Sequence, residues 1–157
     1  QEQFVEAISK LGENIVYLDG QSWEAADKCV INSYTHTNNK IAVLVELETS
    51  GDMEQAKEVA KNVAMHIAAS EVRAISENDL DPAVVEKEKA FLMDQARESG
   101  KPENIIEKMV VGRLNKFKKE VCLMDQNYVK DPDKTISQYL ADASGGLVVK
   151  RFHKETF

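Results

Sequence analysis

Apolar residues in the first part of the chain change from a helical spacing to an extended one. Phe4, Ile8 and Leu11 recur at intervals of three and four residues, and Gly12 follows directly. This spacing predicts a short helix that ends at Gly12, because glycine readily adopts the backbone conformation that terminates a helix. The next residues, "NIVYL" at 14–18, predict a short extended segment.

Two alternating stretches then predict a hairpin of β-strands. They are "KCVINSYTH" at 28–36 and "KIAVLVELET" at 40–49, joined by a "TNNK" turn. Asn38 and Asn39 suit this turn, because asparagine tolerates the positive φ angles that a tight hairpin needs. Alternate positions of the second strand carry Ile41, Val43, Val45 and Leu47. One face of the hairpin should therefore be strongly apolar.

The clearest helix covers "DMEQAKEVAKNVAMHIAAS" at 52–70. Asp52 is a good N-cap, and Gln55 three residues later completes a pattern like a capping box. Apolar residues recur along this helix at steps of three and four, so they predict a stripe that covers the sheet. The stripe consists of Met53, Ala56, Val59, Ala60, Val63 and Ile67.

Two further helices are predicted on either side of a tight turn. One begins at Pro82, with Asp81 as its cap, and runs to about residue 98; the next begins at Pro102. Gly100 separates them, and so short a connection favours an antiparallel pair of helices.

The apolar positions of this pair form one narrow seam. In the second helix they step by four, four, three and four residues, a spacing typical of a coiled coil. They are Ile106, Val110, Leu114, Phe117 and Val121. The first helix contributes Val85, Leu92 and Ala96, with the polar Lys89 interrupting its stripe. The remaining surface is charged, so we expect the hairpin to project from the globular body.

The C-terminal part predicts one short helix and one strand. Pro132 and Thr135 are expected to open a helix that runs through Leu140, after an irregular stretch. "GGLVVKRFH" at 145–153 predicts a final strand that returns to the sheet. No internal repeat or linker divides the chain, so we expect a single domain over 1–157 with a hairpin insertion at about 82–120.

Composition excludes some classes of function. The chain carries 20 basic and 27 acidic side chains, for a net charge of −7. Nucleic-acid binding is a poor interpretation, because phosphate contacts need a basic surplus or a basic stripe. A membrane span is not expected either, because the longest strongly apolar run is Ile41–Val45, far below about 20 residues. The first residue, Gln1, begins a predicted helix, so we expect a fragment of a longer protein.

Few residues offer catalytic or metal chemistry. The two cysteines, Cys29 and Cys122, have no metal-ligand spacing and predict reduced, partly buried thiols. His36 lies at the predicted turn, where a solvated side chain is usual, and His153 lies close enough to the end to fray. Nucleotide-binding, serine-hydrolase and zinc-protease motifs are absent from the sequence.

His66 is the remaining candidate, and three interpretations stay open. It can be a half-buried histidine with a backbone or solvent partner, a surface contact for another protein, or a metal or catalytic residue. Its helical neighbours at three and four residues are Asn62, Val63, Ala69 and Ser70. They include neither a zinc ligand nor a carboxylate to orient the ring, so the third interpretation is the weakest.

Five stretches, taken together and in order, resemble translation elongation factor Ts. They are "LGENI" (11–15), "AMHIAAS" (64–70), "VVEKEKAF" (84–91), "SGKPENIIEKMVVGRLNKFKKEVCLMDQNYVKD" (99–131) and "KTISQYL" (134–140). The long stretch is the most specific, because it joins a turn, a helix and the following loop in one register. The resemblance runs over nearly the whole chain.

The resemblance implies an α+β fold and a role in translation. The fold is a small antiparallel three-stranded sheet covered by helices on one side, with a protruding helical hairpin. The implied function is guanine-nucleotide exchange on elongation factor Tu, in which binding to this GTPase promotes GDP release. It involves no cofactor, no metal and no enzymatic chemistry. The expected location is the bacterial cytoplasm, with an organelle matrix as the alternative.

The same resemblance suggests contact residues. The histidine of the family's matching stretch lies on the surface that faces the partner, which makes His66, Met65 and Ser70 the candidates here. The "LGEN" turn, with Gly12, Glu13 and Asn14, is a weaker candidate.

Two departures from the family limit the expected activity. The family's N-terminal helical domain and its Thr-Asp-Phe motif, which intrudes near the nucleotide, are absent from this sequence. We therefore expect the chain to supply the docking part of an exchange factor.

Two rival functions compete with this interpretation. A dimerisation module would self-associate through the sheet or the helical hairpin, which allows a homodimer. A small hydrolase built on His36 and nearby carboxylates would need a nucleophile, and the sequence offers none.

Overall fold

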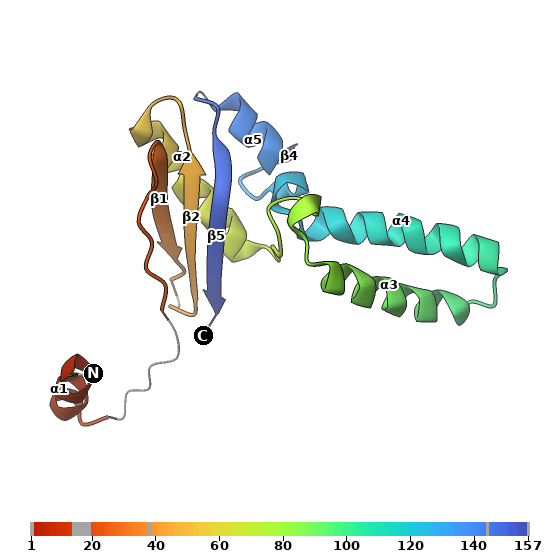
Figure 1. Ribbon diagram of the computed structural model, residues 1–157, viewed down its shortest axis with the longest axis horizontal. Coiled ribbons are helices and arrows are strands. Elements are labelled where there is room, and N and C mark those ends of the chain that lie inside the picture. Colours follow the sequence, from red (N-terminus) through yellow and green to blue (C-terminus); the bar gives the residue numbers. More distant parts are fainter. Residues whose placement is uncertain (1, 14–19, 38, 144, 157) are drawn as a thin grey trace.

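A three-stranded antiparallel sheet forms the centre of the molecule. The computed structural model describes residues 2–13, 20–37, 39–143 and 145–156 (Figure 1). Its sheet has the order β1 (Cys29–Thr35), β2 (Ile41–Glu48) and β5 (Val148–Thr156). β2 pairs antiparallel with both neighbours, which confirms the strand hairpin and the return of the final strand. The predicted α+β class is therefore confirmed.

The helix α2 (Met53–Ala69) covers one face of this sheet. Asp52 caps it as predicted, since its carboxylate accepts hydrogen bonds from the backbone N–H groups of Glu54 and Gln55. Most of the predicted stripe is buried, and Ile67 is completely inaccessible. Met53 is an exception: its side chain is 43% exposed, because it lies in the first turn, beyond the edge of the packed surface.

The other end of α2 is fixed to the sheet by a lysine. The Nζ atom of Lys154, on β5, donates hydrogen bonds to the carbonyl oxygens of Ile67 (3.0 Å) and Ser70 (2.9 Å). The last carbonyls of a helix lack partners within it, and a positive charge there is favourable. This contact therefore anchors the end of α2 that carries His66.

Two helices form the predicted antiparallel hairpin, which projects from the body in Figure 1. They are α3 (Pro82–Arg97) and α4 (Glu103–Val121), and Gly100 turns between them with φ +67°. A separate apolar cluster closes the hairpin, and its buried members are Leu92, Ala96, Ile106 and Val110. Part of the predicted seam thus packs between the two helices, whereas its members Val85, Phe117 and Val121 pack in a second cluster at the base of the hairpin. Asp81 caps α3 by accepting from Ala83 N–H.

The base of the hairpin joins the body through a short parallel bridge between Ala74 and Cys122. Backbone hydrogen bonds on both sides extend it, from Arg73 N–H to the carbonyl of Val121 and from Leu123 N–H to the carbonyl of Ala74, each 2.9 Å long. Ala74, Leu80, Val121 and Cys122 form a small apolar cluster here. The 3₁₀ turn η1 (Glu77–Asp79) adds an ion pair between Glu77 and Lys118. We call this region the joint.

The stretch after the hairpin is more ordered than predicted. It contains the 3₁₀ turn η2 (Leu123–Asp125), the two-stranded ribbon of β3 (Asn127–Tyr128) and β4 (Asp131–Thr135), and α5 (Ile136–Asp142). The prediction that Pro132 opens the helix is wrong, because Pro132 lies in β4. Thr135 is the actual cap, in a reciprocal capping box with Gln138.

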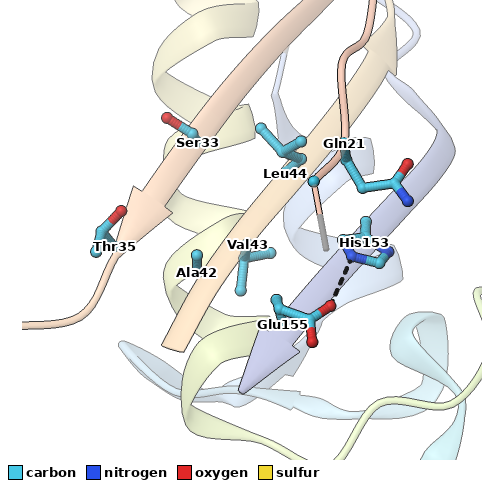
Figure 2. Close-up of a pocket in the computed structure, with 9 residues that line it drawn as sticks. Gln21, Ser33, Thr35, Ala42, Val43, Leu44, His153 and Glu155 are labelled. Atoms are coloured by element: carbon cyan, nitrogen blue, oxygen red, sulfur yellow. Dashed lines mark hydrogen bonds and ion pairs between the residues drawn. The ribbon is translucent and has the colours of Figure 1, made fainter. Parts of the chain in front are cut away.

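The face of the sheet opposite α2 is partly covered by residues 20–28. Arg151 lies over the ring of Trp23 at 4.2 Å and donates from Nε to the buried Glu46 (2.5 Å). Toward the other end of this face lies an apolar hollow lined by Gly20, Gln21, Ser33, Thr35, Ala42, Val43, Leu44, His153 and Glu155 (Figure 2). The predicted fraying at His153 is wrong, because this residue pairs with Leu44 inside β5.

The helix α1 (Glu2–Leu11) lies apart from the sheet in Figure 1. It ends at Gly12 as predicted, with φ +68° at that residue. The predicted extended segment at 14–18 falls outside the described residues. In the part of the chain that the structure describes, no helix is long and apolar enough to cross a membrane.

Candidate functional site

A shallow cleft lies where the end of α2 meets the joint. We call it the His66 cleft, and its lining residues are His66, Ser70, Glu71, Lys116, Lys119, Glu120, Asp125, Gln126 and Asn127. α2 and the residues after it supply one wall, the last turns of α4 supply another, and η2 with its following residues closes the third side. Positive and negative side chains are mixed around the cleft.

The imidazole of His66 forms part of the floor of this cleft. The side chain is 1% exposed, so the expectation that it lies on the surface is wrong. Its Nε2 atom is 2.8 Å from Oε1 of Gln126, and its Nδ1 atom accepts a hydrogen bond from the backbone N–H of Val129 at 3.3 Å. A buried ring needs both nitrogens paired, and residues 126–129 supply both partners. Of the three interpretations of His66, the half-buried histidine with a backbone or solvent partner is the nearest to the structure, because Val129 N–H is a backbone partner.

These contacts select one neutral form of the ring. The Gln126 amide nitrogen donates to two carbonyl groups, so its oxygen must face His66. Nε2 of His66 therefore carries the proton, and Nδ1 is free to accept from Val129. Burial lowers the pKa of His66 below its ordinary 6.5, while the Gln126 hydrogen bond opposes this shift. The neutral ring is thus the form that fits the site.

Gln126 connects three parts of the structure through one side chain. Its amide nitrogen donates to the carbonyl of Glu71, just after α2, at 2.9 Å, and to the carbonyl of Glu120, in the last turn of α4, at 2.6 Å. Its oxygen accepts from His66, and its own carbonyl accepts from Ile136 N–H at the start of α5. No motif or periodicity in the sequence points to this residue.

An aromatic pair packs behind His66. The rings of Tyr128 and Tyr139 stack with centroids 4.4 Å apart, and Tyr128 lies 6.2 Å from the His66 ring. The Tyr139 hydroxyl accepts from Asn62 Nδ2 (3.0 Å), and Lys130 donates to the same asparagine's oxygen. Burial raises the pKa of Tyr128, so its hydroxyl remains protonated. These contacts hold the ring of His66 in a rigid setting.

The other predicted contact residues separate into two groups. Met65 and Ser70 are half-buried, near His66 in the final turns of α2 and at its C-cap. Gly12 and Glu13 are exposed residues that follow α1, which lies apart from the sheet (Figure 1). Asn14 falls outside the described residues. The structure therefore brings together the first group of candidates, and it does not bring Gly12 and Glu13 to the His66 cleft.

The described residues offer little for covalent or metal chemistry. His36 Nδ1 lies 3.1 Å from the Tyr34 hydroxyl, and His153 Nε2 lies 3.1 Å from Glu155 Oε2. In Figure 2, Ser33 lies on the opposite strand from His153 and points away from it. Within the described ranges, no three His, Cys, Asp or Glu side chains are placed to hold a metal ion. Cys29 and Cys122 are free and buried, and burial raises the pKa of both thiols.

Comparisons with a family model and with curated proteins all point to one family. The family described as Elongation factor TS matches residues 1–155. Elongation factor Ts of Alkalilimnicola ehrlichii is 48% identical over 147 residues, which are 94% of this chain and 47% of that protein. The corresponding protein of Bartonella bacilliformis is 45% identical over 148 residues, or 91% of this chain and 48% of that protein. The chain spans about half the length of these relatives. It belongs to the elongation factor Ts family.

Proposed function

We propose that this chain is the docking part of a guanine-nucleotide exchange factor for elongation factor Tu, acting in translation elongation in the bacterial cytoplasm. The chain belongs to the elongation factor Ts family, and the observation that carries the proposal is where the candidate contact residues lie in its structure. His66 and the C-cap Ser70 line the cleft at the base of the projecting hairpin, and Met65 precedes His66 near the end of α2. A partner that contacts this end of α2 can also reach the hairpin.

Exchange by such a protein is allosteric linkage and needs no covalent chemistry. A protein that binds the nucleotide-free GTPase more tightly than the GDP-bound GTPase weakens GDP binding by the same factor. Couplings of this kind are about 1–3 kcal/mol, or roughly 5- to 150-fold in affinity. Since the chain spans about half of its relatives, we assign docking to this chain and GDP release to the longer protein.

The burial of His66 changes the role that we propose for it. Met65 is the more accessible side chain, and methionine is common among the anchors of protein interfaces. His66 shapes the floor of the cleft and holds residues 126–129 in place beside it. Ser70 adds a polar contact at the rim. Gly12, Glu13 and Asn14 remain a second, weaker contact in this proposal.

The test combines a binding titration with release of a fluorescent GDP analogue from elongation factor Tu. We expect the chain to bind without accelerating release. Met65→Ala should weaken binding about tenfold, the equivalent of about 1.4 kcal/mol. Lys61→Ala is the matched control, because Lys61 is exposed on the same helix and should leave the affinity unchanged.

His66→Ala should weaken binding as well, but it also removes the partner of Gln126 and Val129. Its free energy of unfolding must therefore be measured beside its affinity. Absence of binding by the unsubstituted chain would contradict the proposal, as would equal affinities of the Met65 and Lys61 variants. Faster GDP release by this chain alone would show that docking and exchange are not divided as proposed.

Self-association is a second candidate function, favoured by the hollow in Figure 2. Ala42 and Leu44 line it on β2, opposite the face that α2 covers. A second copy could cover this surface and form a homodimer. Sedimentation velocity over a range of concentrations tests this: a dimer should form in the absence of elongation factor Tu, and Leu44→Glu should abolish it. A constant monomer mass would contradict this function.

A further inference from the structure

We propose that Gln126 is a positioning residue that sets the direction of the α3–α4 hairpin relative to the His66 end of α2. The inference deepens the proposed function. Only the expected effect on the affinity for elongation factor Tu rests on that function. Its own basis is the geometry of the joint, where one amide side chain bonds to three separate segments.

The hairpin depends on the joint for its direction. Its own apolar cluster consists of residues from α3 and α4, and the joint has a separate small cluster around Ala74 and Cys122. The backbone bonds between residues 73–75 and 121–124 form one side of this attachment. Gln126 braces another side, because its amide spans from Glu71 to Glu120 across the cleft. Without this brace, the parallel bridge, the small cluster and the Glu77–Lys118 ion pair remain, and the cleft side of the attachment loses its hydrogen bonds.

Each hydrogen bond of Gln126 has a partner with few alternatives. Glu120 lies in the last turn of α4, where carbonyl groups have no partner within the helix. Neighbouring carbonyls there are used by backbone donors: Lys118 accepts from Cys122 N–H, and Val121 accepts from Arg73 N–H. The amide of Gln126 supplies the corresponding donor for Glu120. The same side chain accepts from the protonated nitrogen of His66, so it links the end of α4 to the histidine at the end of α2.

The backbone of Gln126 makes this brace rigid. Its N–H donates to the carbonyl of Leu123 (3.3 Å), and its carbonyl accepts from Ile136 N–H (2.9 Å). Leu123 and Ile136 are both completely inaccessible members of the body core. The side chain is therefore mounted on the body and reaches from there to the end of α4.

The experiment measures the distance between the body and the hairpin directly. Cysteines replace Lys61 on α2 and Glu98 at the end of α3, both exposed, and carry spin labels for pulsed electron spin resonance. The native thiols Cys29 and Cys122 are buried, and burial raises their pKa, so they should react slowly. Gln126→Leu is compared with Gln138→Leu, which also removes a bond between a side-chain amide and the backbone, from Thr135 N–H to Gln138 Oε1 at the start of α5.

We expect Gln126→Leu to broaden or shift the distance distribution, while Gln138→Leu leaves it as in the unsubstituted chain. Nitrogen-15 spectra of His66 should show the Nε2-protonated form in both proteins, because Val129 N–H still donates to Nδ1, and the Nε2 signal should shift in Gln126→Leu, which removes its acceptor. Affinity for elongation factor Tu should fall at least about fivefold, the lower end of typical coupling between sites. If Gln126→Leu does not fold, Gln126→Asn, which is too short to reach all three partners, serves in its place.

The outcomes separate this inference from the proposed function. An unchanged distance distribution in both Gln126 variants would overturn the positioning role. A changed distribution with undiminished affinity would overturn its importance for docking. If the unsubstituted chain does not bind elongation factor Tu but the distances change as expected, the proposed function fails and the positioning role of Gln126 stands.

Discussion

The body core and the hairpin seam are both apolar, but they are enclosed to different degrees. In the body, Leu47, Ile67 and Leu123 come from a strand, a helix and a turn far apart in sequence, and none is accessible to solvent. In the hairpin, two helices bury one narrow strip, and Phe91 beside it is 60% exposed. The body is thus held by contacts across the chain, whereas the hairpin relies on local contacts and on its joint.

Of the substitutions that test this comparison, Ile67→Ala should lower the free energy of unfolding the most. Truncation of a completely buried isoleucine leaves a cavity among strands and helices, and it costs about 2–5 kcal/mol. That is a large part of the free energy of unfolding of a typical protein, which is about 5–15 kcal/mol. Urea unfolding followed by circular dichroism measures the loss. Met53→Ala, on the exposed edge of the same helix, should change the free energy of unfolding by no more than about 0.5 kcal/mol.

A loss below about 1 kcal/mol in Ile67→Ala would contradict the comparison. It would show that the body core closes around the missing atoms as easily as a two-helix seam can.

Ile106→Ala should have a smaller effect that is confined to the hairpin. Ile106 is 2% exposed within the seam, but its neighbours come from two helices that can shift together. We expect a loss of about 2 kcal/mol, the lower end of the range for such truncations. Hydrogen exchange should show it as faster exchange of amides in 82–121, with β2 unchanged, because regions with separate cores open separately.

The adjacent residue provides the control for this prediction. Ile105 is 43% exposed, so Ile105→Ala removes the same atoms from a position outside the seam and should leave exchange nearly unchanged. If Ile106→Ala accelerated exchange in β2 to the same extent as in α4, the hairpin and the body would unfold as one unit.

The sequence predicted the elements of both regions well, because their apolar spacing is local information. The hairpin seam from Ile106 to Leu114, the cap at Asp81 and the stripe of α2 from Ala56 to Ile67 follow from periodicity and capping rules alone. Pro132 was misplaced, because a proline suits an edge strand as well as the first turn of a helix.

The candidate site was predicted less well, because its geometry comes from contacts distant in sequence. Nothing near His66 in the sequence shows that Gln126 and Val129 complete its hydrogen bonds, 60 and 63 residues later. The segment that approaches His66, residues 126–129, belongs to the same chain. Gln126 lies in a stretch without periodicity, so no pattern predicted its role. The one local indication is that it lies between two apolar residues, Leu123 and Tyr128, that are buried in the structure.

Acidification should lower the free energy of unfolding through His66, which lies where the body meets the hairpin. This is the smallest of the three expected effects. Burial lowers the pKa of His66 in the folded chain, so on acidification the unfolded chain takes up a proton that the folded chain still excludes. The stability contributed by the neutral ring is therefore complete above pH 6.5 and is lost as the pH falls from there toward the lowered pKa. For one group the slope cannot exceed about 1.4 kcal/mol per pH unit.

Unfolding measured at a series of pH values in the unsubstituted chain and in His66→Gln checks this prediction. The slope below pH 6.5 should be shallower in the variant, whose side chain at this position does not titrate. Amide signals of residues 121–129 should move with the His66 titration, and those at the far end of the hairpin, near Gly100, should not. Equal slopes in the two proteins would mean that the folded site accepts the proton. The Val129 N–H would then need another acceptor, and His66 would not be the fixed neutral link between the body and the hairpin.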